Sequence, residues 1–538
     1  RLTNLAHLDF LQDDVTPSDQ ARHTTYRLAQ EPSLGVLWTY ADLRAGGEYE
    51  RIGGGTHDPE TNTWSQGAFN ADDITRAAVV YLRHWRQFGD APSRERAYQL
   101  LRAVTYLQTA SGPNAGNVVL WMQPDGTLNP SAEPVELPDP SDSGPSYWLA
   151  RTVWALGEGY AAFAGQDPQF AAFLEDRLAM AVDALERQVL SRYGRWEISD
   201  GRRVPAWLVV DGADASAEAV LGLSRYVQTA PAGTQLRHRA ATALGRLAEG
   251  IAAMSASDTR DWPYGAVLPW THSGSIWHAW ASQMPSALAG AAGALDRPAL
   301  LRPAVRDSGT FTPYLLTSTG PVNGLLPSPS DRTQIAYGVD SRLQALLAVG
   351  EQARAPGLVD LAGITAAWYF GANPAGETMY DPSTGRTFDG INGDGVVNRN
   401  SGAESTIHGL LSMLALDARP NLAAAAQSTT TLAEQDGVDV VEAESATTSG
   451  QARVVTPDPA WTGESLWSGS ALELGPGAAT ASWNVPAVQQ PRIVVPVVHA
   501  TQGRDAPDIG FSSGGRSLGR VATGGADSQG VSEAPGAL

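Results

Sequence analysis

Residues 398–417 place one carboxylate where a buried helix face would meet a pocket. Four apolar residues in this segment follow the i, i+3, i+4, i+7 spacing of a buried helix face: Ile407, Leu410, Leu411 and Leu414. Glu404 lies one turn before this stripe, so its side chain points with the buried face but at the first turn of the helix. Free backbone N–H groups there favour an anion, and the position suits a catalytic acid.

The same residue types also fit a structural role. Ser401 and Glu404 have the spacing of a capping box, in which a Glu at the third helical position reaches back to the cap. Capping boxes are common and catalytic carboxylates are rare. Taken alone, Glu404 therefore favours the structural role.

The rest of the chain repeats a helical pattern that would bring further polar groups beside Glu404. Apolar helices rich in Ala and Gly are predicted to begin near Asp72, Ser146, Asp214, Gln283, Gln334 and Gly402, about 50 to 75 residues apart. More charged, amphipathic helices alternate with them, over 93–109, 168–190, 234–254, near 298 and over 358–370. Helical hairpins of a common period stack into a closed ring. The sequence therefore predicts a mainly α fold, an (α/α)6 toroid, with one outer helix not located.

In such a ring the inner helices point the same way, so their first turns converge on one mouth. Each predicted inner helix has polar residues at or near its start: Asp72, Asp73, Asp142, Ser143, Asp211, Asp214, Gln283, Asp331, Gln334, Glu404 and His408. One capping carboxylate is ordinary. A ring of them around a shared cavity indicates a pocket in which paired carboxylates act as acid and base.

The helical phase distinguishes the two adjacent aspartates. Asp73 precedes Ala77 by one turn and adjoins the buried stripe, whereas Asp72 is rotated by about 100 degrees. We expect Asp73 to be the base and Asp72 its partner, because adjacent carboxylates can hold different pKa values. Glu404 would then be the acid.

Two long loops, 114–147 and 258–280, are expected to form the walls of a substrate cleft. Tryptophans beside Gly, Pro or polar residues commonly expose aromatic faces that stack on sugar rings. The residues predicted to bind substrate are Trp121, Tyr147, Asp211, Asp214, Trp262, Trp270, His278 and His408. His272 or His278 could instead act as a base, although histidines near tryptophans are more often structural.

Composition excludes several kinds of chemistry. The 538 residues include no cysteine, and all 37 basic positions are arginine. Thiol nucleophiles, thiolate metal sites, Schiff-base lysines and the P-loop lysine are therefore absent, and no cofactor is expected. A formal net charge of −20 repels polyanions, so nucleic-acid binding is not expected. No apolar run reaches the roughly 18 residues of a membrane span, and the start at Arg1 favours a mature, secreted or cell-surface protein.

The character of the sequence changes toward both ends. Residues 1–60 are predicted to form a collar of loops and short strands before a toroid over 61–427. Residues 428–436 read as a linker. From 437 to 538, β-branched residues alternate between Gly, Pro and Asn turns, which predicts a β-sandwich.

Two segments resemble known families. Residues 368–416 resemble the closing segment of (α/α)6-toroid glycoside hydrolases, including those similar to family-nine endoglucanases. The resemblance implies an Asp base early in the ring and a Glu acid at the start of its last helix. Asp72 or Asp73 and Glu404 match those places, although NADD at 70–73 replaces the family's DAGD-like motif. Residues 441–445, VEAES, resemble the opening strand of carbohydrate-binding modules, which implies that Glu442 and Glu444 could hold a structural calcium ion.

Together these features predict a glycoside hydrolase that cleaves a polysaccharide or oligosaccharide by a two-carboxylate, inverting mechanism. One alternative is a polysaccharide lyase on the same ring, with Tyr or His as base and arginines that neutralise a uronate. Another is a noncatalytic glycan-binding surface protein whose carboxylates are dispersed or engaged in caps. One fold hosts many functions, so the geometry of the site has to separate these three.

Overall fold

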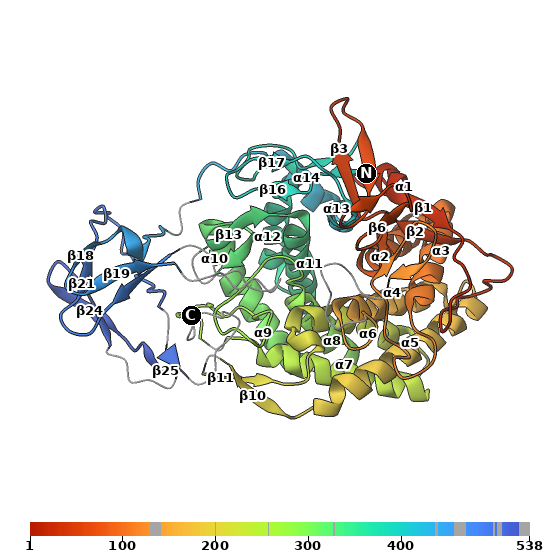
Figure 1. Cartoon of the computed structure of the whole chain (residues 1–538), viewed down its shortest axis with the longest axis horizontal. Helices are drawn as coiled ribbons and strands as arrows, with labels where there is room; N and C mark the ends of the chain where they lie inside the picture. The colour runs from red at the N-terminus through yellow and green to blue at the C-terminus, as the bar shows by residue number, and fades with distance from the viewer. Residues whose placement is uncertain are drawn as a thin grey trace.

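The computed structural model of the protein describes residues 1–129, 141–199, 201–256, 258–325, 329–435, 439–456, 470–498, 501–502 and 508–526. A helical body makes up most of the molecule, and the C-terminal strands lie to one side of it (Figure 1). Part of the first predicted cleft wall, 130–140, and the first residues of the predicted sandwich, 437–438, lie outside the described residues.

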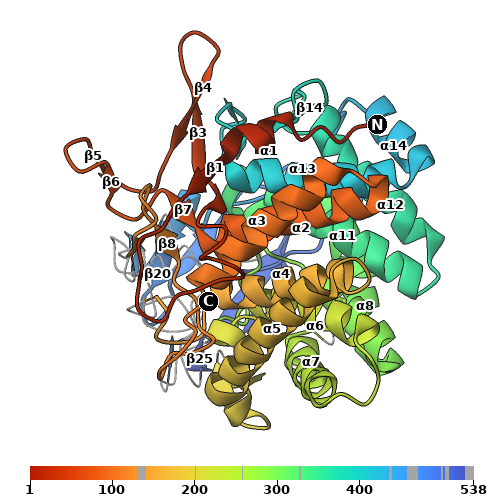
Figure 2. The ribbon, with the colours of Figure 1, turned by 90° about the vertical axis from the view of Figure 1, so that its right-hand side faces the viewer.

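Six helices form an inner ring in the described chain: α2 (Ala71–Phe88), α4 (Tyr147–Phe163), α6 (Ala213–Thr229), α8 (Met284–Leu295), α11 (Ala336–Gln352) and α13 (Ala403–Asp417). Each packs against the next, and α13 packs against α2, which closes the ring. Figure 2 shows these helices grouped inside the helical body. Each begins within two residues of the start predicted from the sequence. The predicted toroid is therefore confirmed.

An outer layer packs on the inner ring, one partner for each inner helix. Its members are α3 (Ala91–Leu107), α5 (Pro168–Gln188), α7 (Gln235–Ala253), α9 (Leu301–Arg306) with η4 (Asp307–Phe311) and α10 (Thr312–Ser318), α12 (Pro356–Ala366) and α14 (Pro420–Ser428). The short helices η3 (Pro298–Leu300) and η5 (Ala367–Phe370) adjoin α9 and α12. The outer helix that the sequence pattern does not locate is α14. Its alanine-rich sequence carries no clear stripe, and packing against α12 and α13 holds it helical.

Helix α2 shows how the sequence positions one inner helix. The side chain of Asn70 accepts the backbone N–H of Asp73 at 2.7 Å and caps the helix. The apolar stripe from Ile74 to Leu82 is buried. At the far end, Gly89 takes the left-handed conformation (φ 70°) that closes the helix. The first turn is thereby fixed where its acidic residues reach the middle of the ring.

Helices α4 and α6 touch backbone to backbone. A Cβ atom at Gly157 would lie 2.1 Å from the carbonyl oxygen of Gly222, and one at Gly222 would lie 2.2 Å from that of Val153. Only glycine permits so close an approach. The crossing fixes the relative position of the two helices that carry Arg151 and Glu218.

Short strands surround the start of the ring. Before α2 lie α1 (Ala6–Leu11), β1 (Gln12–Val15), β2 (Leu34–Leu37), β3 (Tyr40–Leu43), β4 (Tyr49–Ile52), β5 (His57–Asp58), β6 (Thr63–Trp64) and β7 (Phe69–Asn70). β1 pairs with β2, β3 with β4 and β5 with β6, all antiparallel. β7 pairs with β8 (Trp121–Met122), which pairs with β9 (Leu128–Asn129).

Later loops contain further short strands and helical turns. These are η1 (Leu190–Arg192), β10 (Trp196–Ser199), β11 (Arg202–Pro205), η2 (Val209–Asp211), β12 (Val322–Leu325), β13 (Pro329–Gln334), β14 (Tyr380–Asp381), β15 (Arg386–Thr387), β16 (Gly390–Ile391) and β17 (Val397–Asn398). β10 and β11 form a hairpin, β14 pairs with β15, and β12, β13, β16 and β17 form one small sheet that leads to the start of α13.

The C-terminal region is built of strands, as predicted from its alternating pattern. After η6 (Ala443–Ser445) come β18 (Thr447–Ser449), β19 (Ala452–Val455), β20 (Ala471–Leu474), β21 (Thr480–Ser482), β22 (Thr501–Gln502), β23 (Ile509–Ser513), β24 (Arg516–Val521) and β25 (Gly524–Ala526). Where described, these strands pair two by two: β18 with β21, β19 with β20, β22 with β25 and β23 with β24. Their closure into a sandwich stays a prediction. Among the described helices, none has both the length and the apolarity to cross a membrane.

Candidate active site

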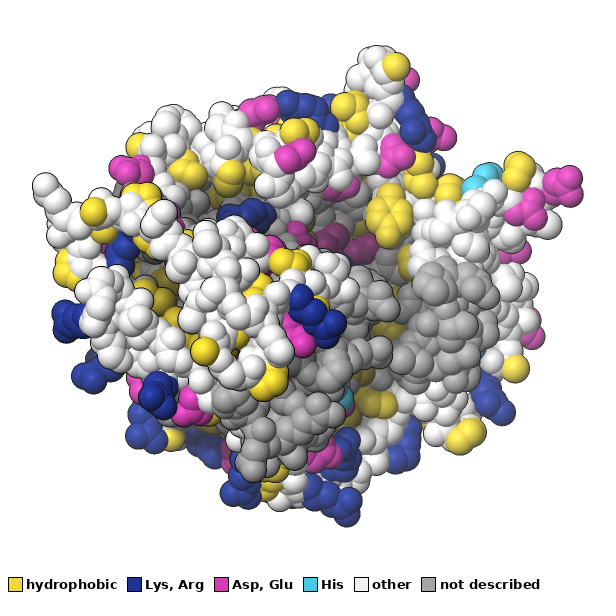
Figure 3. Space-filling model, turned by 60° about the vertical axis from the view of Figure 1, so that its left-hand side comes forward, with side chains coloured by type: hydrophobic (Ala, Val, Ile, Leu, Met, Phe, Trp, Pro, Cys, Tyr) yellow, Lys and Arg dark blue, Asp and Glu magenta, His cyan; other side chains and the backbone are white. Residues whose placement is uncertain are grey.

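The first and second turns of all six inner helices meet in one charged network, which we call the central cluster. Its members are Asp72, Asp73 and Arg76 from α2, Arg151 from α4, Glu218 from α6, Gln283 at the start of α8, Tyr337 and Asp340 from α11, and Glu404 and His408 from α13. Figure 3 shows acidic side chains gathered inside a hollow in one face of the molecule. The predicted convergence of the first turns is thus present.

Arg151 joins four of these helices. Its Nη1 lies 2.8 Å from Asp72 Oδ1, and its Nε lies 2.7 Å from Glu218 Oε2. Its Nη2 donates to the hydroxyl of Tyr337 at 3.2 Å, and that hydroxyl donates in turn to Glu218. Gln283 donates to the same Glu218 carboxylate at 3.4 Å. Burial, reinforced by the charge of Glu218, raises the pKa of Tyr337 well above its usual value, so the hydroxyl keeps its proton.

Arg76 joins α2 to α13. Its Nη2 lies 2.9 Å from Asp73 Oδ1, and both Nη1 and Nη2 donate to Glu404 Oε2 at 3.2 Å. Nη1 also lies 3.1 Å from His408 Nε2. The guanidinium is only 2% exposed, so the cluster holds a buried cation between two carboxylates.

Glu404 has no capping role. Asp389 caps α13 instead, because its Oδ1 accepts the backbone N–H of Gly402 at 2.8 Å and the hydroxyl of Ser405 at 2.6 Å. The hydroxyl of Ser401 donates to the carbonyl of Thr387. The capping-box interpretation is therefore wrong. The side chain of Glu404 is 45% exposed and is held by Arg76.

The two adjacent aspartates differ in access to solvent. Asp73 adjoins the buried stripe, as predicted, and its side chain is only 5% exposed, with Oδ2 accepting from Asn70 at 2.7 Å. Burial raises the pKa of Asp73 to about 6; Arg76 opposes this shift and Glu404 adds to it. The side chain of Asp72 is 20% exposed. Of the two, Asp72 has the better access to a substrate.

Both histidines predicted to bind substrate are buried. His408 is fully enclosed, with Nδ1 2.8 Å from Asp340 Oδ2 and its ring stacked on Tyr337 at 3.7 Å. His278 is 1% exposed, with Nδ1 2.7 Å from the carbonyl of Trp280 and Nε2 3.5 Å from Asp214 Oδ2. Neither histidine offers exposed surface, and direct contact of His408 or His278 with substrate stays a prediction.

Tyr147 and Asp214 lie beside the central cluster. The hydroxyl of Tyr147 donates to Asp214 Oδ2 at 2.8 Å, and the guanidinium of Arg151 lies 5.3 Å from the Tyr147 ring centre. Asp214 is fully buried, whereas Tyr147 is half-buried. Direct substrate binding by this pair stays a prediction, and Tyr147 is the member with solvent access.

Trp121 is a support rather than an exposed platform. It is 6% exposed and lies on β8, where it pairs with Asn70, the cap of α2. Cβ atoms at Gly54 and Gly67 would lie 2.7 and 2.8 Å from its side chain, so the loop glycines close over it. The prediction that Trp121 exposes an aromatic face is wrong, because the neighbouring glycines are small enough for the loop to pack directly on the ring.

The other two predicted tryptophans contact groups outside the central cluster. Trp262 donates to the carbonyl of Ser275 at 2.7 Å and packs edge-on against Phe311. Trp270 is half-buried and stacks on His272 at 4.8 Å, with the rings 3° from parallel. His272 in turn lies 3.1 Å from Asp211. Of these, Trp270 with Asp211 retains the features of a sugar-binding surface, since an aromatic face lies beside a carboxylate.

The residues that could hold calcium do not form a complete site. Glu442 is exposed, and Glu444 Oε2 is buried without a hydrogen-bond partner in the described region. Across the described residues, no three His, Cys, Asp or Glu side chains lie together as a metal site. Two carboxylates fall short of the six to eight oxygens that calcium takes, so the calcium ion stays a prediction.

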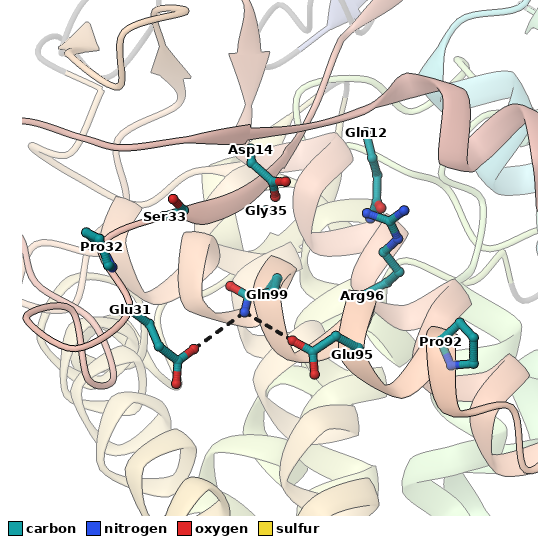
Figure 4. A pocket seen from close by; sticks show the side chains of 10 residues that line it. All are labelled: Gln12, Asp14, Glu31, Pro32, Ser33, Gly35, Pro92, Glu95, Arg96 and Gln99. Carbon is teal, nitrogen blue, oxygen red and sulfur yellow. Dashed lines mark hydrogen bonds between the residues drawn. The ribbon is translucent and has the colours of Figure 1, made fainter.

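A second hollow, of about 500 Å³, lies outside the ring between β1, β2 and α3 (Figure 4). In this second hollow, the side-chain amide of Gln99 donates to Glu31 at 3.5 Å and to Glu95 at 3.2 Å. Two acidic groups of the hollow are thus hydrogen-bonded to one amide. None of its lining residues belongs to the central cluster. The candidate active site is therefore the hollow at the first turns of the inner helices.

Sequence reasoning missed five members of the central cluster: Arg76, Arg151, Glu218, Tyr337 and Asp340. A usable signal was present, since each lies in the first two turns of a helix that is otherwise small and apolar. A charged residue on a buried helix has to be paired. Charged residues at matching depth in several inner helices could therefore have indicated mutual pairing.

Comparison with known proteins supports the fold. No protein-family model matches the sequence, and no curated protein matches it either. A sugar epimerase from a ruminal bacterium is similar in structure over 74% of this chain and 94% of its own, with a TM-score of 0.51 and 12% identity. Cellobiose 2-epimerase from Bacillus thermoamylovorans is similar over 67% of this chain and 94% of its own, with a TM-score of 0.46 and 9% identity. An α-1,6-mannanase from a Salegentibacter species is similar over 66% of this chain and 93% of its own, with a TM-score of 0.40 and 11% identity. All three are sugar-processing enzymes by name. None is a family-nine endoglucanase, so that resemblance stays a prediction.

Proposed function

We propose that the protein is a glycoside hydrolase that cleaves an uncharged polysaccharide or oligosaccharide, with Glu404 as the acid and Asp72 as the base. One observation carries the proposal. Glu404 and Asp72 are solvent-accessible, and each is held by a buried arginine whose second carboxylate partner is buried. Two accessible carboxylates on neighbouring helices are the groups that glycoside hydrolysis needs.

The choice of Asp72 over Asp73 follows from the space between the carboxylates. Asp73 and Glu404 contact the same nitrogen of Arg76, at 2.9 and 3.2 Å. The oxygens in these two contacts therefore lie closer together than the roughly 6.5 Å that separates the carboxyl groups of inverting enzymes at the least. The guanidinium also lies between them, where the attacking water would have to bind. The carboxylate of Asp72 pairs with Arg151 instead, so it does not share the cation that holds Glu404.

One oxygen of Glu404 is left to donate the proton of the acid. Arg76 is one cation shared by two carboxylates, and the charge of Glu404 contributes to the raised pKa of Asp73. Arg76 occupies Oε2 of Glu404, which leaves Oε1 as the oxygen that can donate a proton to the leaving group. Asp72 then activates the water on the opposite face of the sugar.

The rival functions fit the contacts less well. A lyase needs arginines open to a uronate, yet Arg76 and Arg151 are each occupied by two carboxylates. A noncatalytic protein would use its acids as caps, whereas Glu404 is not one. The neighbours named as epimerases share the fold. In this chain, however, both ring nitrogens of His408 and of His278 are engaged by protein groups, which favours the carboxylates as the reacting residues.

The test is a screen of neutral bacterial and plant polysaccharides, including mannan, xylan and β-glucan, for release of reducing ends. We expect one of them to be cleaved by the wild type and not by Glu404→Gln. Glu377→Gln is the matched control, because Glu377 is an exposed glutamate paired with Arg399 outside the ring. Full activity of Glu404→Gln on the cleaved polymer, or equal loss in the control, contradicts the assignment.

A further inference from the structure

The position of Glu404 depends on a single side chain. Among the described residues, the contacts of its carboxylate are the two hydrogen bonds from Arg76. An exposed carboxylate on one anchor moves whenever the anchor moves. The groups that orient Arg76 therefore also orient Glu404.

Every N–H of Arg76 has an acceptor. Its Nε donates to the carbonyl of Asp72 at 3.0 Å, and Nη2 donates to Asp73 and Glu404. Nη1 donates to Glu404 and, at 3.1 Å, to His408 Nε2. A guanidinium has five N–H donors in a fixed plane, so all five are used here. His408 is the one neutral acceptor among the side chains around it.

His408 can accept from Arg76 in only one form. A carboxylate only accepts, so the 2.8 Å contact with Asp340 places the proton of the imidazole on Nδ1. Nε2 then presents its lone pair to Arg76. Asp340 is fixed in turn, because its Oδ1 accepts from Ser412 at 2.9 Å and from Gln344 at 3.0 Å, which leaves Oδ2 for His408.

We propose that Asp340 and His408 are a positioning pair that sets the orientation of Arg76 and, through it, of Glu404. The inference rests on the proposed role of Glu404. Neither residue touches the sugar, since both are buried. The pair holds one acceptor, His408 Nε2, at a fixed position beside Arg76. The hydrogen bond to this acceptor orients the guanidinium so that it faces the carboxylate of Glu404.

The surroundings of His408 keep it neutral. It faces Arg76 from α2, Asp340 and the stacked ring of Tyr337 from α11, and Glu404 from its own helix. Burial lowers its pKa below the ordinary value of 6.5; the hydrogen bond to Asp340 opposes this shift, and Arg76 adds to it. If His408 also took up a proton on Nε2, this N–H would face the N–H groups of Arg76. The hydrogen bond between the guanidinium and the imidazole would then be lost.

Asp340→Asn is the variant that tests the pair. The amide oxygen can keep the hydrogen bonds from Ser412 and Gln344, which turns the amide NH2 toward His408. His408 Nδ1 then has to accept, its proton moves to Nε2, and Nε2 faces Arg76 with a donor. We expect kcat on the cleaved polysaccharide to fall by about 10²- to 10⁴-fold with KM little changed. Ser412→Ala is the control, because it removes one bond to Asp340 and leaves the tautomer unchanged.

Nitrogen NMR of protein labelled with ¹⁵N-histidine gives a readout that does not depend on activity. The His408 signals, assigned from their loss in His408→Gln, should show the proton on Nδ1 in the wild type and on Nε2 in Asp340→Asn. A wild-type proton on Nε2 overturns the proposal whatever the variants do. If the tautomers are as expected but no glycan is cleaved, the pair stands and the proposed hydrolase activity fails. A full rate in Asp340→Asn with the proton on Nε2 also overturns the proposal.

Discussion

Glu404 accepts two hydrogen bonds from Arg76, both at 3.2 Å and both at the same oxygen. The last inner helix is thereby tied to the first across the point where the ring closes. The arrangement leaves one oxygen of an exposed carboxylate unoccupied by the arginine, on a side chain whose backbone is capped by another residue, Asp389.

The two adjacent aspartates should respond differently to the same substitution. We expect Asp72→Asn to lower kcat by about 10²- to 10⁴-fold with little change in stability, because it removes an accessible base. Asp73→Asn removes a buried charge that the raised pKa marks as unfavourable above about pH 6, so at pH 7 it should not lower the free energy of unfolding, and it should keep a larger part of the activity. Urea unfolding and turnover on the cleaved polymer separate the two. A stable, inactive Asp73→Asn with an active Asp72→Asn would reverse the roles.

The pH dependence of activity follows from the titration of Asp73. Its folded pKa of about 6 lies above the ordinary 3.8, so Asp73 is protonated below about pH 6 and ionised above it. An ionised Asp73 competes with Glu404 for Arg76, so kcat/KM should fall as the pH rises through about 6. In Asp73→Asn the charge at this position no longer changes, and this step in the pH profile should be absent. A step that stays in place in this variant contradicts the role of Asp73.

The pH dependence of stability should show Asp73 and His408 with opposite signs. The raised pKa of Asp73 means that the folded state binds the extra proton, so stability from this group is lost as the pH rises from about 3.8 to about 6. The pKa of His408 is lowered, so its contribution is lost as the pH falls below 6.5. Urea midpoints across this range in Asp73→Asn should lack the first slope. An unchanged slope in that variant assigns the titration to other groups.

The charge of the cluster predicts which polymers are rejected. Arg76 and Arg151 are each paired with two carboxylates, so the site presents excess negative charge. We expect no depolymerisation of polygalacturonate or alginate, and no ultraviolet absorbance from a new double bond. Neutral polymers should be cleaved at rates that depend weakly on salt. Cleavage of a uronate polymer, faster at low salt, would favour the lyase instead.

The backbone contact between α4 and α6 predicts a stability change without a change in chemistry. Gly157→Ala adds a methyl group where 2.1 Å separates the new atom from a carbonyl oxygen, and the strain should cost about 1–3 kcal/mol. Gly165→Ala is the control, because no heavy atom lies within 4 Å of its added Cβ. Urea unfolding measures both. Equal stabilities would show that the two helices can move apart freely.

The sequence predicted the ring well because its signals are local. Caps such as Asn70 and Ser146 and the apolar stripes lie within single helices, so they fix each start to within two residues. The alanine-rich α14 lacks such a signal and is helical through packing alone. Trp121 was misplaced for a related reason, since the glycines that cover it, Gly54 and Gly67, are far from it in the sequence.

The acids of the site could be predicted, but their partners could not. Glu404 and the two aspartates stand at helix starts, where sequence position implies location. Pairing across the ring, such as that of Arg151 with Asp72, depends on which helices are neighbours and on side-chain reach. The assignment of the cap of α13 to Asp389 also depends on a tertiary contact. A capping box was therefore the reasonable local interpretation of Ser401 and Glu404.

The most direct test of the central claim compares two leaving groups in Glu404→Gln. A polysaccharide needs a proton from the acid on its leaving oxygen, whereas a dinitrophenyl glycoside of the same sugar leaves without one. We predict that kcat falls by about 10²- to 10⁴-fold on the polymer and changes little on the dinitrophenyl glycoside. Equal losses on both substrates, or no loss on the polymer, would contradict the role of Glu404 as the catalytic acid.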